Sequence, residues 1–126
     1  MLELATGAFL ILHGLVHLGY LSPKPDDPRY PFTPERAWLV SAANVDVIAA
    51  KGIFTTIAAL TVLSYTIAGI GVVVGAGWWP ALAVAGSVAS LIVLVLGFHP
   101  WLVLGVAIDV AIIAGVSASW PAELFR

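Results

Sequence analysis

Four long stretches of apolar residues alternate with shorter polar segments along the chain. The stretches cover residues 2–21, 45–74, 79–98 and 101–120, and charged residues are rare in all of them. A helix needs roughly 20 mostly apolar residues to cross the hydrocarbon core of a bilayer, which is about 30 Å thick. The pattern therefore predicts an all-α protein, an integral membrane four-helix bundle in which residues 1–126 form a single transmembrane domain.

The connections between these stretches differ in length and polarity. The first, residues 22–44, is long, polar and rich in proline, which favours extended or turn backbone over helix. Within it, Thr33-Pro34-Glu35 is typical of a helix start, so we expect a short interfacial helix from Pro34 to about Ala42. The other two connections are short turns, which predict antiparallel neighbouring spans.

The start of the second span carries its own signal. Asn44 and Asp46 are residue types that cap helix N-termini, and they directly precede the second apolar stretch. We therefore expect this helix to open near Val45. It would be about 30 residues long, enough to project beyond the bilayer or to tilt.

Composition narrows the class of protein further. Hydrophobic residues make up 61% and charged residues 10% of the chain, which excludes a soluble monomer of this size. The net charge of −2 comes without a basic cluster, which argues against nucleic-acid binding. The chain has no cysteine, so it holds no disulfide and no thiolate metal site.

Basic residues predict the orientation in the membrane. Lys24, Arg29, Arg36 and Lys51 lie on the side of the long connection, and Arg126 lies on the opposite side. Because Lys and Arg accumulate in cytoplasmic loops, we expect residues 22–44 in the cytoplasm of a multi-pass cell-membrane protein, with both termini outside. The tryptophans support these boundaries, because every one falls at a predicted span end, where indole rings favour the headgroup level: Trp38, Trp78, Trp79, Trp101 and Trp120.

The first span carries polar residues on one helical face. Its stripe, spaced by steps of three and four, consists of Glu3, Thr6, Leu10, His13, His17 and Tyr20. Gly7 and Gly14 lie beside the stripe and would let another backbone approach closely. Polar side chains are costly in lipid, so this face is expected to turn into the bundle.

Two ionisable residues are expected at the same depth. His13 lies eight residues before Leu21, and Asp109 lies eight residues after Trp101, so each is about 12 Å into its span from the cytoplasmic side. A buried acid in mid-membrane requires a partner or a proton, and His13 is placed to supply one. We expect a polar pocket facing the cytoplasm, lined by His13, His17, Lys51 and Asp109, that binds a small or lipid-soluble ligand or relays protons.

Other functions remain open. The His and Asp side chains can instead act as structural hydrogen bonds in an accessory subunit of a larger membrane complex or a homo-oligomer. Rows of small residues would then form the contacts with the lipid-embedded partner: Gly71 and Gly75; Ala81, Ala85 and Ala89; Ala83 and Ser87; and Ala107, Ala111, Gly115 and Ser119. In an enzyme, His13 or His17 would be the acid or base, but no motif indicates a substrate.

A metal or haem site is a further alternative to a site without a cofactor. His13 and His17 are four residues apart on a helix, so their side chains converge on one side. With Asp109 they would suit one divalent metal ion such as zinc. Haem would need an axial histidine from another helix, and His99 lies at a span end.

The chain resembles a set of small, uncharacterised prokaryotic membrane proteins with four spans. The resemblance is carried by the HGLVHLGY run at residues 13–20, Arg36-Ala37-Trp38-Leu39 before the second span, the Trp78-Trp79 turn, and the step from Gly105 to Asp109. It implies a four-helix membrane fold and no particular activity. These proteins more often have Asn at the last position, so Asp109 is a departure from their pattern.

Overall fold

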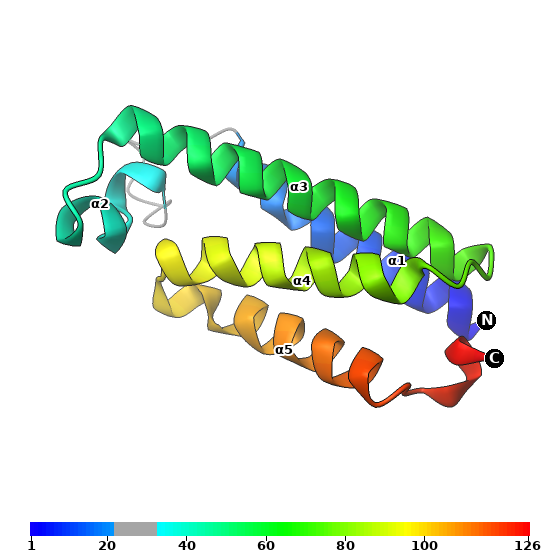
Figure 1. Ribbon diagram of the computed structural model, residues 1–126. Coiled ribbons are helices and arrows are strands. Elements are labelled where there is room, and N and C mark those ends of the chain that lie inside the picture. Colours follow the sequence, from blue (N-terminus) through cyan, green and yellow to red (C-terminus); the bar gives the residue numbers. More distant parts are fainter. Residues whose placement is uncertain (22–32) are drawn as a thin grey trace.

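The structure is a computed structural model that describes residues 1–21 and 33–126 (Figure 1). The proline-rich segment expected at residues 22–32 lies outside the described residues. The described part is helical and contains no strand. In chain order its elements are α1 (Leu2–Val16), η1 (His17–Tyr20), η2 (Pro34–Arg36), α2 (Trp38–Ala42), α3 (Val47–Val73), α4 (Trp79–Leu96), η3 (Pro100–Leu102), α5 (Val103–Ser117) and η4 (Ala122–Phe125).

Among the described residues, four helical segments are long and apolar enough to cross a membrane. They are Leu2–Tyr20, Val47–Val73, Trp79–Leu96 and Pro100–Ser117. Each corresponds to one predicted apolar stretch, which confirms the all-helical class and the number of candidate spans. Figure 1 shows both termini at one end of the bundle, with α2 at the other.

The bundle exposes many large apolar side chains and buries several polar ones among its apolar core. Large apolar side chains on the surface include Leu12, Leu63 and Leu104, which are 65%, 57% and 68% exposed. Fully buried side chains include Thr61 and Asp109. An apolar surface with polar side chains in the interior is the arrangement expected where the surrounding solvent is hydrocarbon.

Glycines let α1 and α3 pack at close range. A Cβ atom on Gly7 would lie 2.7 Å from the backbone oxygen of Gly69, and one on Gly14 would lie 2.7 Å from Cβ of Tyr65. The expectation that Gly7 and Gly14 admit a neighbouring backbone is confirmed, and the neighbour is α3. α3 also packs along α4, and α4 carries α5 on its other side.

The helix ends differ in detail from the sequence expectation. Asp46 caps α3, because its side chain accepts hydrogen bonds from the backbone N–H groups of Ile48 and Ala49, so the helix begins at Val47 rather than near Val45. The short helix expected from Pro34 is divided into η2 and α2 by Ala37, whose backbone is extended.

The turn after α3 explains one of the predicted small-residue pairs. Gly75 has a φ of 67°, and the N–H groups of Gly75 and Ala76 bond to the carbonyl oxygens of Val72 and Gly71. This is the Schellman arrangement, in which glycine supplies the left-handed residue. A Cβ on Gly71 would lie 2.6 Å from the Trp78 ring, so Gly71 makes room for the turn of its own chain.

Candidate functional site

Asp109 lies at the centre of a hydrogen-bonded cluster in the bundle interior. Its side chain is fully buried. Oδ1 is 2.9 Å from Nε2 of His13 and accepts a hydrogen bond of 2.6 Å from the Tyr65 hydroxyl, and Oδ2 accepts one of 2.5 Å from Ser90. Each candidate span therefore contributes to the cluster: α1, α3, α4 and α5.

The polar stripe of the first span turns inward as expected along most of its length. Leu10, His13, His17 and Tyr20 are all buried, whereas Glu3 at the start of α1 is exposed. The expected contact between His13 and Asp109 is confirmed by the 2.9 Å distance between Nε2 and Oδ1. The shared face persists beyond α1, because the chain continues into η1 at His17.

Ser90 connects Asp109 to His17. Its hydroxyl oxygen lies 2.5 Å from Oδ2 of Asp109 and 2.8 Å from Nε2 of His17. The other imidazole nitrogen of His17, Nδ1, lies 3.3 Å from the backbone oxygen of His13. His17 and Asp109 are therefore linked through one hydroxyl group, which can accept a hydrogen bond from one neighbour while it donates to the other.

This bridge has two proton arrangements, and the second holds one proton more than the first. In the first, Asp109 is ionised, Ser90 donates to it, and Nε2–H of neutral His17 donates to Ser90. In the second, Asp109 is protonated and donates to Ser90, Ser90 donates to Nε2, and His17 carries its proton on Nδ1. The second arrangement also lets Nδ1 donate to the His13 carbonyl oxygen, an acceptor.

Tyr65 and Ser90 are site residues that sequence reasoning did not identify, and Ser87 contacts the cluster only through Tyr65. Sequence spacing places Ser87 in a small-residue row. In the structure its hydroxyl oxygen lies 2.8 Å from that of Tyr65, and its O–H group donates a hydrogen bond to the backbone oxygen of Ala83. Tyr65 offered a signal, because tyrosine favours the membrane interface and this one lies in the middle of an apolar stretch. Serine gave no comparable signal, since it is common in packed transmembrane helices.

A cavity of about 340 Å³ adjoins the cluster, and we refer to it as the histidine cavity. Its polar side chains come from α1 and η1: His13, His17 and Tyr20. The remaining wall is glycine or apolar and comes from α1, η1, the end of α4, η3 and the first half of α5: Val16, Gly19, Leu94, Trp101, Leu102, Leu104, Gly105 and Ile108. The two imidazoles thus stand between the buried acid and an apolar space.

Lys51 lies apart from the cluster. Its ammonium group is 2.7 Å from Oε1 of Glu35, which belongs to η2. Lys51 and Tyr65 are fourteen residues apart on α3, or about 21 Å along the helix axis. Of the residues expected to share one pocket, the structure brings together His13, His17 and Asp109 and gives Lys51 a different partner.

The histidines engage different partners, His13 the carboxylate and His17 the serine hydroxyl. Among the described residues, no group of three or more His, Cys, Asp or Glu is arranged to hold a metal ion. The divalent metal at His13, His17 and Asp109 stays a prediction. His99 caps η3, where its Nδ1 accepts a hydrogen bond from the backbone N–H of Trp101.

Comparison of this chain with protein-family models, curated proteins and solved structures finds no match.

Proposed function

We propose that this chain is an integral membrane protein that binds a small, lipid-soluble weak acid beside His17 and takes up its proton. The observation that carries the proposal is the chain of hydrogen bonds from fully buried Asp109 through Ser90 to His17, whose side chain lines the histidine cavity. The cytoplasmic position of residues 22–44 belongs to the same proposal and rests on the distribution of Lys and Arg.

The free-energy cost of a charge in lipid favours a site in which Asp109 can gain a proton. An ionised carboxylate in mid-membrane is expensive unless it is hydrogen-bonded or paired, and the bonds from His13, Tyr65 and Ser90 offset that cost only in part. A weak acid that reaches the cavity through the membrane can neutralise Asp109 by giving up its proton. The proton then needs a path, since Asp109 itself is fully buried.

The hydrogen-bonded bridge through Ser90 supplies that path. The ligand hydroxyl gives its proton to Nδ1 of His17, where the existing contact with the His13 carbonyl oxygen is the longest of the cluster at 3.3 Å. Nε2 of His17 passes its proton to Ser90, and Ser90 passes its own to Oδ2 of Asp109. His17 remains neutral with its proton on the other nitrogen, and the ligand becomes an anion.

Serine substitutions on α4 test this path, with para-nitrophenol as the probe because its anion is yellow. In protein reconstituted into nanodiscs, we expect saturable binding and a bound fraction of anion above that in solution at the same pH. Ser90→Ala should lower the bound anion about tenfold, because the proton can no longer reach Asp109. Ser87→Ala is the matched control, since this serine is also buried on α4 but lies outside the path.

Infrared spectroscopy gives an independent readout. Probe binding should produce a protonated-carboxyl band that is absent in Asp109→Asn. An equal anion yield in Ser90→Ala and Ser87→Ala, or uptake of the probe that never saturates, would contradict the proposal.

A structural role is the second candidate, favoured by the surface of α5. Within α5 and the turn that follows it, the small residues Ala107, Ala111 and Ser119 are exposed, so this row is available to a second copy or to a larger membrane complex. If this reading holds, Ala107→Leu will abolish assembly measured by native mass spectrometry. Apolar replacement of His13, His17 and Asp109 will then leave the assembly intact.

A further inference from the structure

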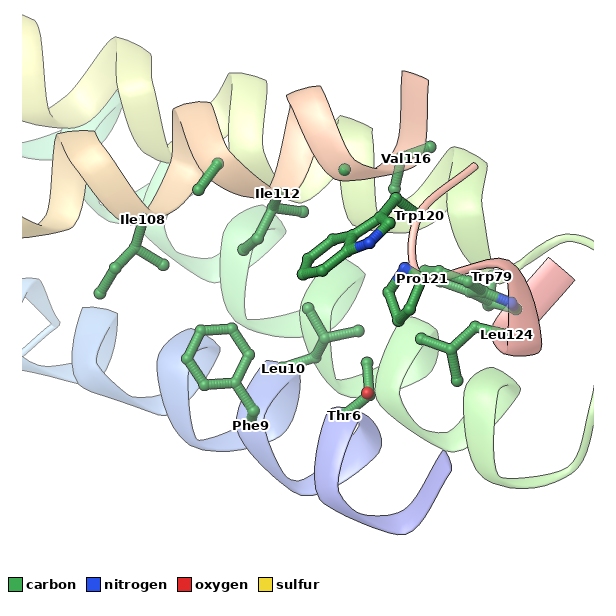
Figure 2. Close-up of a pocket in the computed structure, with 12 residues that line it drawn as sticks. Thr6, Phe9, Leu10, Trp79, Ile108, Ile112, Val116, Trp120, Pro121 and Leu124 are labelled. Atoms are coloured by element: carbon green, nitrogen blue, oxygen red, sulfur yellow. The ribbon is translucent and has the colours of Figure 1, made fainter. Parts of the chain in front are cut away.

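A second cavity, of about 260 Å³, lies between α1 and α5 toward the end of the bundle that holds the termini; we call it the seam cavity (Figure 2). Figure 2 shows Phe9 and Leu10 of α1 facing Ile108 and Ile112 of α5 across it, with the Trp120 ring near the middle of the lining. Its lining is apolar apart from Thr6 and is completed by Trp79, Ala111, Gly115, Val116, Pro121 and Leu124.

The seam cavity and the histidine cavity follow one another along the same pair of helices. Ile108 lines both. On α1 the lining passes from Thr6 in the seam cavity to Val16 in the histidine cavity, a rise of about 15 Å over ten residues. The two cavities therefore follow one another between α1 and α5, and we call them together the hollow; His17 lies toward one end of it and Thr6 toward the other.

The shape and polarity of this hollow point to one kind of occupant. The lining of the seam cavity spans only Thr6 to Leu10 on α1 and Ile108 to Val116 on α5, about 6 Å and 12 Å along the helix axes, which is much shorter than a partner helix that crosses the bilayer. A single hydrocarbon chain is narrow enough to lie between α1 and α5. The ionisable side chains that line the hollow, His13, His17 and Tyr20, gather at one end, which suits a molecule with one polar head.

We infer that the ligand is a single-chain amphiphile whose hydroxyl-bearing head lies beside His17 and whose tail lies in the seam cavity. This inference rests on the proposed function for the position of the head. A tail gains little free energy on leaving other hydrocarbon, so hydrogen bonds at the head supply affinity. We expect the seam cavity to select ligands by the shape of the tail.

The test uses a long-chain phenol with a nitroxide at the end of its chain, a group that quenches nearby tryptophan fluorescence. Trp79 and Trp120 line the seam cavity, so the bound probe should quench their emission at concentrations that saturate. Ala111→Phe fills the seam cavity from an exposed position on α5 and should weaken probe binding at least tenfold. Ala114→Phe is the matched control, because Ala114 is exposed on the same helix and lines neither cavity.

Para-nitrophenol separates this inference from the proposed function, because it has a head and no chain. Its affinity should change less than twofold in Ala111→Phe. Equal binding of the long-chain probe to both phenylalanine variants would overturn the tail assignment while leaving the head site intact. If the unmodified protein does not bind para-nitrophenol, the proposed function is wrong. Binding of the long-chain probe that is weakened by Ala111→Phe would still support the tail assignment in that case.

Discussion

The carboxylate of Asp109 accepts from side chains on α1, α3 and α4, so its replacement tests the whole cluster. Asp109→Leu leaves the polar groups of His13, Tyr65 and Ser90 buried without their acceptor, and we expect a loss of about 2–4 kcal/mol in the free energy of unfolding. Asp109→Asn keeps an acceptor oxygen and should cost about 1 kcal/mol.

Unfolding by sodium dodecyl sulfate in mixed micelles measures both Asp109 variants. A leucine variant as stable as the unmodified protein would show that apolar packing can replace the cluster, as happens for some buried polar groups.

A second residue-level prediction concerns pH and the ion pair between Glu35 and Lys51. Burial raises the pKa of Glu35, but the Lys51 ammonium and the polar groups of Thr33 and the local backbone outweigh this effect, so the pKa lies below its usual 4.5. A lowered folded-state pKa stabilises the fold above the unfolded value, and this contribution is lost as pH falls through the folded one.

Because Lys51 is 47% exposed, the pair should contribute only about 0.2–1 kcal/mol. We expect Glu35→Gln to remove this contribution at pH 7 and to have little effect once the pH is well below 4.5. Measuring the free energy of unfolding of both proteins against pH checks this; a difference that grows as the pH falls would have the wrong sign.

Packing between elements depends on how closely α1 approaches α3. A Cβ on Gly69 would lie 2.6 Å from the backbone oxygen of Gly7, so Gly69→Ala forces the helices apart and should cost about 1–3 kcal/mol. Gly52 on the same helix has open space around it, and Gly52→Ala should instead gain about 0.5–1 kcal/mol from helix propensity.

The same unfolding measurement ranks these two alanine variants. Destabilisation of equal size in both would mean that the cost comes from the residue type rather than from the α1–α3 contact.

The sequence predicts the number of long helices correctly, but it places their ends only to within a few residues. Apolar stretches located all four long helices, because the length needed to cross hydrocarbon leaves few alternatives. The ends shifted by a few residues: α3 begins at its Asp46 cap, and α5 ends at Ser117, where a turn with Ser119 at a φ of 48° closes the helix. Such ends are set by local hydrogen bonds, which hydropathy does not report.

For the molecule as a whole, orientation is the prediction to test, and the absence of native cysteine makes the experiment clean. Ala43 and Gly77 are both exposed and lie just beyond opposite ends of α3, and a Cβ atom at Gly77 would have no neighbour within 4 Å. We expect a membrane-impermeant maleimide added to intact cells to label Gly77→Cys, and Ala43→Cys to react only after the membrane is opened. The reverse pattern would invert the proposed topology, and labelling of both in intact cells would contradict a crossing by α3.

Hydropathy and helical spacing determine the features of this protein that depend on one helix at a time. They give four apolar helices, a first helix with a polar face, and the equal depth of His13 and Asp109, because rise per residue and the cost of polar groups in lipid act along one segment at a time.

The partners within the site depend on how the helices pack, and no single segment encodes that. Ser90 and Tyr65 join Asp109 because α3 and α4 present them at its depth, and Lys51 pairs with Glu35 because η2 folds against α3. The hollow between α1 and α5 likewise exists because each helix packs mainly on a different neighbour, α3 or α4. Spacing along the chain reports the face and the depth of a side chain, whereas the rotation and distance of its neighbours arise from contacts between residues far apart in sequence.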